Sequence, residues 1–334
     1  MPTSTQEALE SQQDTARTKA DQANSSLGRY LVSSAMAGAY VGVAVVLLLA
    51  TTSTMIAAKS TDTRLIQGSV FGIALTLVVF AGAELFTGNV MTMIQGLLSR
   101  SVTPGEAAVV CTGSLLGNLM GSLGFAGLVA GSAVVTGGVP PGTQSVIHAA
   151  LAGIVQAKEK LTGGELFLRA VLCNMLVCLA IWMASRTKSD AAKLLCLFWA
   201  LLAFVASGFE HSVANMTVFS LAIFTHADGG TWAAMARNLL YTVPGNIVGG
   251  GLLVGVGYAY VGRPQLLAPR PTVDLALPDV TVSTNGGTAG NTAGRAKAVA
   301  RTRRTTSAPP VVATAQAVPT ASSRRTRTPS GAGR

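Results

Sequence analysis

The stretch GAELFTGN at residues 82–89 decides the fold of this chain, because a related stretch recurs further along it. Residues 208–215 read GFEHSVAN, so the two stretches share the pattern G-x-E-x4-N and lie 126 residues apart. A second shared pattern, G-N-x-x-G, follows each of them, at residues 117–121 and 245–249, 128 residues apart. Two matches in the same order at nearly one offset indicate an internal duplication.

The composition around these motifs is that of a membrane protein. Apolar residues make up 49% of the 334 residues and charged residues only 11%, whereas soluble domains carry about 25% charged residues. Most of the apolar segments exceed the roughly 20 residues that a helix needs to cross about 30 Å of hydrocarbon. We therefore predict an all-α integral membrane protein with six transmembrane helices, at residues 30–58, 66–98, 107–135, 166–185, 194–224 and 239–261.

The duplication divides these six segments into two halves of three helices. Because three is odd, the halves enter the membrane from opposite sides, which predicts an inverted repeat. The second and fifth segments are long and carry the G-x-E-x4-N motif in their middle, which favours broken helices over tilted continuous ones. In inverted repeats, broken helices meet near the midplane and their ends line the solute path.

The chain has three predicted parts. Residues 1–27 form an N-terminal cytoplasmic or interfacial helix, residues 28–263 the transmembrane domain, and residues 264–334 a disordered basic tail. The tail holds ten Lys and Arg against two Asp, so most of the net charge of +10 lies there and the body is not a nucleic-acid-binding domain. Lys and Arg in the short loops favour cytoplasmic termini in a multi-pass protein of the cell (inner) membrane.

Glu84, Glu210 and His211 are the acidic and histidine residues deep inside the apolar segments, where ionisable groups mark function by default. A structural role is also open, since the glutamates can accept hydrogen bonds from freed backbone N–H groups and His211 can be a satisfied buried side chain. An imidazole at a helix break can donate to an anion and exchange a proton near neutral pH. The Thr87 hydroxyl, in the first break, can pair with His211 or with the solute.

Three further polar residues are candidates. Asn174 and Asn215 are neutral amides in apolar helices, able to orient the breaks or to solvate a passing ion. Lys158, just outside the fourth segment, would concentrate anions at the outer mouth, although an ordinary loop lysine fits the same pattern. The four cysteines lie within or beside apolar segments without a C-x-x-C pair, which predicts buried residues rather than a metal site.

At these motifs the chain is similar to the formate/nitrite transporter family of pentameric anion channels. The resemblance covers residues 27–262 and implies a homopentamer with one pore in each aquaporin-like protomer. It is carried by AGAELFTGNV (81–90), LGNLMGS (116–122), LCNMLVCLAIWMA (172–184), GFEHSVANMT (208–217) and NLLYTVPGNIVGG (238–250).

The resemblance also assigns roles. It makes Thr87 and His211 the central polar site and makes Phe71 and Phe204 the outer hydrophobic constriction. The inner constriction would consist of Leu75, Leu85 and Val177. The residues that match the polar positions around the site are Lys158, Asn174, Glu210 and Asn215.

The function implied is passage of a small monovalent anion, with no cofactor and no enzymatic activity. Nitrite is favoured, and formate, hydrosulfide or lactate are the alternatives within the family. We expect His211 to supply a proton, so that the species crossing the inner constriction is neutral. A neutral-solute channel, a membrane enzyme and an interaction protein acting through the tail are the competing classes. Pro244 departs from the family pattern and predicts a bend in the sixth helix.

Overall fold

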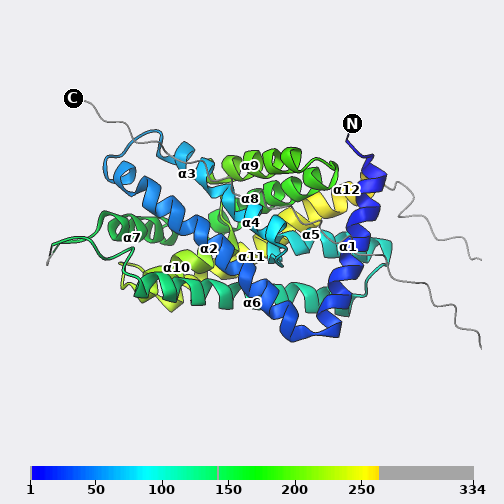
Figure 1. Cartoon of the computed structure of the whole chain (residues 1–334), viewed down its shortest axis with the longest axis horizontal. Helices are drawn as coiled ribbons and strands as arrows, with labels where there is room; N and C mark the ends of the chain where they lie inside the picture. The colour runs from blue at the N-terminus through cyan, green and yellow to red at the C-terminus, as the bar shows by residue number, and fades with distance from the viewer. Residues whose placement is uncertain (1, 141–142, 263–334) are drawn as a thin grey trace, which may run out of the picture. The chain divides into compact units, whose positions relative to one another are not determined.

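The computed structural model describes residues 2–140 and 143–262, and these fold into helices without a β-strand (Figure 1). The predicted basic tail, 264–334, lies outside the described residues. The elements are α1 Thr5–Ser25, α2 Leu27–Ala57, α3 Thr63–Phe71, α4 Ile73–Ala81, α5 Phe86–Ser99, α6 Pro104–Gly131, α7 Val146–Glu159, α8 Gly163–Ser185, α9 Asp190–Ala206, α10 Ser212–Phe224, α11 Trp232–Ile247, the π-helix η1 Val248–Val256 and α12 Gly257–Gly262.

Several helices are long and apolar enough to cross a membrane. Among the described residues five stretches meet this criterion: Leu27–Ala57, Thr63–Ala81, Pro104–Gly131, Gly163–Ser185 and Trp232–Gly262. The predicted fifth segment is divided into α9, of 17 residues, and α10, of 13 residues, so that neither reaches the necessary length alone. The all-helical, membrane-type architecture therefore agrees with the sequence.

Both G-x-E-x4-N motifs lie where a helix ends and the next one begins. α4 ends before Gly82, whose φ of 76° lies in the left-handed region, and α5 begins at Phe86. In the second motif α9 ends before Gly208, with φ of 72°, and α10 begins at Ser212. Glycine, which has no Cβ, adopts this backbone conformation at no steric cost, so the first residue of each motif favours the turn.

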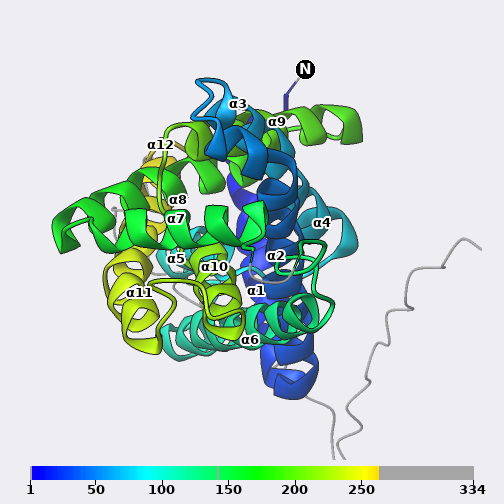
Figure 2. The ribbon, with the colours of Figure 1, turned by 90° about the vertical axis from the view of Figure 1, so that its left-hand side faces the viewer.

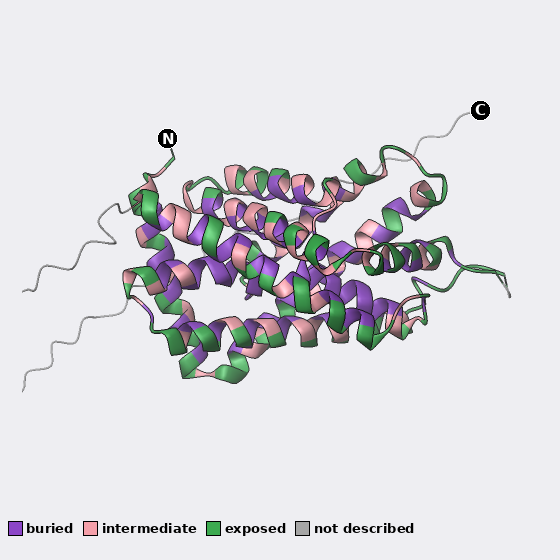
Figure 3. Cartoon of the chain, turned by 180° about the vertical axis from the view of Figure 1, so that it is seen from behind, coloured by how far each residue is buried: buried purple, intermediate pink, exposed green. Residues whose placement is uncertain are grey.

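The helices that follow these turns lie in the interior. Residues 84–93 and 211–222 are buried without exception. Figure 2 shows α10 between α6 and α11 with α7 beside it, and α10 contacts all three. Figure 3 shows buried faces turned inward and exposed residues along the outer faces of the helices. Large apolar side chains such as Leu128, Trp199 and Leu240 are exposed there, as expected of a surface that faces lipid.

Between the third and fourth predicted segments, where the sequence analysis placed an outer loop, the chain forms the short helix α7. Ser145 caps it by accepting from the backbone N–H of Ile147. α7 buries Leu151 and Val155, four residues apart on one face, and ends next to Lys158. Such an amphipathic helix of 14 residues is too short and too polar for a hydropathy pattern to reveal it. Lys158 is thus a helix residue rather than a loop lysine.

α1 stands across the other helices at the end opposite α7 (Figure 1). A capping box starts it: the Ser4 hydroxyl accepts from the backbone N–H of Glu7, and the Glu7 carboxylate accepts from the backbone N–H of Ser4. The second bond lowers the pKa of the Glu7 carboxyl. Ala16 and Ala20 of α1 are buried and pack with Met93 of α5 in one apolar cluster.

The sixth predicted segment is a regular α-helix only to Ile247 and continues as the π-helix η1. Pro244 lies inside α11, where it removes one backbone donor, and η1 begins four residues later. The bend predicted from Pro244 stays a prediction.

Glycines set the closest helix contacts. A methyl group on Gly121 of α6 would collide with the carbonyl oxygen of Ala35 in α2, and one on Gly249 with that of Val171 in α8. Both glycines end a G-N-x-x-G motif, so each motif brings its helix close to a neighbour, α2 in the first case and α8 in the second. Small residues at such crossings let helices pack through dispersion contacts in lipid.

Gly121→Ala should therefore destabilise the protein by about 1–3 kcal/mol, because the added methyl group must push α6 away from α2. Thermal unfolding in detergent measures the effect as a lower midpoint. Gly124→Ala is the matched control in the same helix, since no atom lies within 4 Å of its added methyl group. Equal midpoints for the two variants would contradict close packing at this crossing.

Candidate functional site

The two helix interruptions bring Thr87 and His211 together. Thr87 lies in the first turn of α5 and His211 is the N-cap of α10, and both are buried. Thr87 Oγ1 is 3.2 Å from His211 Nε2. His211 Nδ1 accepts from the backbone N–H of Ala214 at 3.2 Å, so this nitrogen carries no proton. In the neutral ring the proton is then on Nε2, which donates to the Thr87 hydroxyl.

A small cavity of about 10 Å³ lies beside this pair, close to the minimum volume that holds one water. The Phe71 and Phe204 rings meet edge to face, 5.8 Å apart at 84°, and Phe204 stacks on the His211 ring at 5.9 Å. All five predicted constriction residues line the cavity together with the histidine: Phe71, Phe204, Leu75, Leu85, Val177 and His211.

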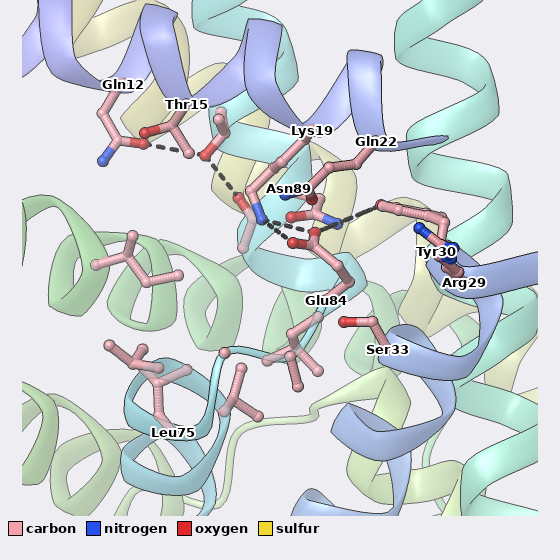
Figure 4. A pocket seen from close by; sticks show the side chains of 18 of the residues that line it. Gln12, Thr15, Lys19, Gln22, Arg29, Tyr30, Ser33, Leu75, Glu84 and Asn89 are labelled. Carbon is pink, nitrogen blue, oxygen red and sulfur yellow. Dashed lines mark hydrogen bonds and ion pairs between the residues drawn. The ribbon is translucent and has the colours of Figure 1, made fainter. Parts of the chain in front are cut away.

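Two larger pockets flank the cavity. We name them by their lysines. The Lys158 pocket has a volume of about 240 Å³. The Lys19 pocket, which Figure 4 shows, has a volume of about 700 Å³. Phe71 and Phe204 line both the Lys158 pocket and the cavity. The three spaces therefore follow one another, with the phenylalanines on one side of the cavity. On its other side, the residues shared with the Lys19 pocket are Leu75 and Leu85.

A buried carboxylate faces the Lys158 pocket. Lys158 Nζ lies 2.8 and 2.9 Å from the two oxygens of Glu210, and Asn215 Nδ2 donates to the same carboxylate at 2.7 Å. The Asn215 amide also donates to Asn238 Oδ1 at 2.8 Å. The structure thus joins three predicted residues, Lys158, Glu210 and Asn215, in one network beside the His211 ring.

An equivalent network borders the Lys19 pocket (Figure 4). Lys19 Nζ lies 2.6 and 2.7 Å from the Glu84 oxygens, and Asn89 Nδ2 donates to Glu84 and to the Tyr30 hydroxyl, both at 3.0 Å. The sequence analysis missed Lys19. The signal that was available is the repeated motif, because a helix with a lysine in its C-terminal part lies ahead of each G-x-E-x4-N motif, α1 with Lys19 and α7 with Lys158.

An asparagine amide satisfies the backbone at the first interruption. Asn118 Nδ2 donates to the carbonyls of Ser34 and Glu84 at 2.7 and 2.9 Å, and its Oδ1 accepts from the backbone N–H of Phe86 at 2.9 Å. The sequence analysis left open that the Glu84 carboxylate takes freed backbone N–H groups. In the described structure Glu84 pairs with side chains instead, because Asn118 already occupies this position.

Asn246 makes the same three bonds at the second interruption. Its Nδ2 donates to the carbonyls of Ala170 and Glu210 at 2.8 and 3.1 Å, and its Oδ1 accepts from the backbone N–H of Ser212 at 2.9 Å. The Glu210 carboxylate likewise pairs with side chains among the described residues, so the backbone-acceptor role is wrong for both glutamates. The asparagines of the two G-N-x-x-G motifs hold the interruptions.

Asn174 joins the central pair to α11 and packs against the π-helix. Its Nδ2 donates to the carbonyls of Thr87 at 3.1 Å and Asn246 at 2.6 Å, and the Cys178 thiol also donates to the Thr87 carbonyl, at 3.3 Å. A methyl group on Gly250 of η1 would collide with Asn174 Nδ2 and Cys178 Sγ. Gly250 thus leaves the space that Asn174 needs to position Thr87, a role that the sequence does not reveal.

The family model for the formate/nitrite transporter matches residues 6–260, three quarters of the chain. The chain belongs to the formate/nitrite transporter family. It is 42% identical over 253 residues to the nitrite transporter NirC of Escherichia coli, covering 75% of this chain and 89% of that protein.

Two solved structures of the family have the same fold. One, titled FNT family ion channel, is 38% identical with a TM-score of 0.70 and covers 76% of this chain and 98% of that chain. The other, a pentameric formate channel with formate bound, is 27% identical with a TM-score of 0.59 and covers 72% and 98%. These relatives are transporters and channels, and the formate/nitrite transporter fold accounts for the buried interruptions described above.

Lys19→Met should destabilise the protein by about 3 kcal/mol, because it leaves the buried Glu84 carboxylate without its cation. Lys19→Met combined with Glu84→Gln should recover much of that loss, as thermal unfolding in detergent would measure. Lys193→Met is the control, since its ion pair with Asp190 is exposed and should contribute less than about 1 kcal/mol. If the loss of stability in the double variant equalled the sum of the losses in Lys19→Met and Glu84→Gln, Lys19 and Glu84 would not be coupled.

Proposed function

We propose that this protein is a channel for small monovalent anions, with nitrite as its first substrate and proton-coupled, pH-dependent passage through each protomer. One observation carries the proposal: the hydrogen-bonded pair Thr87–His211 lies beside a cavity with a phenylalanine pair on one side and aliphatic side chains on the other. Such a site offers donors to an anion where water is excluded.

The architecture that fits this function is a six-span inverted repeat in which the second and fifth spans are broken. The matching bonds of Asn118 and Asn246 support it, because each amide closes the interruption of its own half by donating to two backbone carbonyls and accepting from one backbone N–H. We infer cytoplasmic termini in the cell membrane, with residues 1–27 as a cytoplasmic helix and 28–263 as the membrane domain. The Lys19 pocket then opens inward and the Lys158 pocket outward.

An anion entering from outside meets Lys158 and then the Phe71–Phe204 pair, where it loses water. At the centre it accepts hydrogen bonds from His211 Nε2–H and from the Thr87 hydroxyl. α5 and α10 both begin at this point, and helix N-termini carry partial positive charge. The site therefore stabilises negative charge by donors and dipoles rather than by a fixed cation. Leu75, Leu85 and Val177 would then favour passage of a neutral species.

Proton delivery to the anion uses both ring nitrogens of His211. Loss of the Nε2 proton leaves a neutral ring only when Nδ1 has taken up another proton. A protonated Nδ1 cannot accept from the Ala214 backbone N–H, so protonation opens the cap of α10. Proton coupling in this protein thus includes a local change in the first turn of α10.

Nitrite is proposed first because the relative of 42% identity is a nitrite transporter. Formate is the second candidate because one similar structure is a formate channel, and its pentameric state supports a homopentamer here. Hydrosulfide and lactate remain family alternatives. Stopped-flow flux of these four anions into liposomes with the reconstituted protein ranks them. A neutral-solute channel would show neither competition among anions nor dependence on external pH.

His211→Asn should keep the fold, because asparagine also caps helices, but should abolish the pH dependence of nitrite flux. The measurement is nitrite flux into liposomes between pH 5 and pH 8, with each variant's flux divided by its own flux at one reference pH. His226→Asn is the control, since His226 is exposed and has a positive φ, which asparagine tolerates. An unchanged pH profile in His211→Asn would exclude His211 as proton donor.

A further inference from the structure

Two arginines line the Lys158 pocket in addition to its lysine. Arg64 comes from α3 and Arg169 from α8, and both guanidinium groups lie against Gly208, where α9 has ended. Arg169 Nη1 lies 3.5 Å from the Gly208 carbonyl oxygen. Arg64 Nη1 would lie 3.0 Å from a Cβ added at Gly208. The turn at Gly208 thus brings the two groups to the same side of the pocket, close to the Phe71–Phe204 pair.

In the part of the chain that the structure describes, the positive charges of Arg64 and Arg169 are not neutralised by an ion pair, in contrast to the charge of Lys158. Lys158 pairs with Glu210, whereas within the described residues neither arginine has a carboxylate oxygen within 4 Å. Glu165, four residues before Arg169, attracts it only at longer range. The Lys158 pocket therefore has two positive charges in excess.

We propose that Arg64 and Arg169 form an anion-selecting site at the entrance of the Lys158 pocket, which takes a planar anion with two oxygens. The proposal rests on the proposed function and names a further binding step in front of the phenylalanine pair. A guanidinium group presents parallel N–H donors that match two oxygens on one atom, as in nitrite or formate. Hydrosulfide has a single acceptor atom and gains only from the charge.

Among the described residues, the arginine pair lines the Lys158 pocket and not the Lys19 pocket. The Glu210 backbone N–H donates to the carbonyl of Arg169, and the Glu84 backbone N–H donates to that of Ser33, so Ser33 is the equivalent of Arg169 in the first half. The cations lining the Lys19 pocket are Lys19, which pairs with Glu84, and Arg29. Anion capture is thus asymmetric, with tighter binding on the Lys158 side.

The test uses full-length protein in oriented liposomes and the variants Arg64→Gln, Arg169→Gln and their combination. Nitrite flux is measured against its concentration on the Lys158 side. Each single change should raise the half-saturating concentration about threefold, as expected for exposed charge pairs, and the combination about tenfold. Maximal flux should stay unchanged, because only binding before the constriction is lost. Lys160→Gln, outside the pocket on the same helix end, is the matched control.

Two comparisons distinguish recognition of an anion's two oxygens from simple attraction by positive charge. Arg169→Lys keeps the positive charge but loses the paired N–H donors. The half-saturating concentration of nitrite should therefore rise, while that of hydrosulfide should stay near the wild-type value. Equal changes for both anions in the glutamine variants, or unchanged nitrite half-saturation in the double variant, would overturn the proposal.

Binding without transport distinguishes this site from the proposed function. Saturation-transfer NMR with ¹³C-formate on the protein in detergent should keep its signal in Lys160→Gln and lose most of it in Arg64→Gln/Arg169→Gln, with helix content checked by circular dichroism. Wild-type protein that binds formate in this way but moves no anion would contradict the proposed function and support the site. Equal signals in the wild type and the double arginine variant would contradict the site, whatever the flux.

Discussion

The structure depends on two asparagine amides that satisfy backbone groups at interrupted helices. Inside a membrane no water replaces a lost helix hydrogen bond, and each unsatisfied group costs several kcal/mol. Asn118 and Asn246 each supply two donated bonds and one accepted bond to the residues around an interruption. Because the amides replace water there, the chain can turn within the protein interior and start a second helix.

The central site follows from that constraint. α5 and α10 start in the interior, so their N-terminal ends and the side chains of their first turns meet at one point. His211 serves the fold and the chemistry with different atoms, since Nδ1 caps α10 while Nε2 faces Thr87. Asn174 bonds to the carbonyls of both Thr87 and Asn246, and thereby connects the site in one half to the asparagine of the other.

The repeated motifs predicted the interruptions, because these depend on order along the chain, whereas the residues around the cavity were assigned by the resemblance to the family. The meeting of Thr87 with His211 was one of two alternatives that the sequence left open for the Thr87 hydroxyl. Lys19 was not predictable in the same way, since it reaches Glu84 only after α1 folds across the end of α5. α7 escaped notice because a short amphipathic helix has no strong apolar signal. Gly250 contacts Asn174 because η1 packs against α8, and the spacing of residues in the sequence does not predict this contact.

Paired lysines explain how buried glutamates fit a path for anions. An unpaired carboxylate beside the cavity would repel an anion strongly at low dielectric. Lys19 and Lys158 cancel that charge, and Asn89 and Asn215 bind the remaining lone pairs. The two networks differ in their last partner, the Tyr30 hydroxyl in one and the Asn238 amide in the other. Both G-x-E-x4-N motifs thus hold a neutralised carboxylate, while the outer partners of the two networks differ, as do the pockets that the networks border.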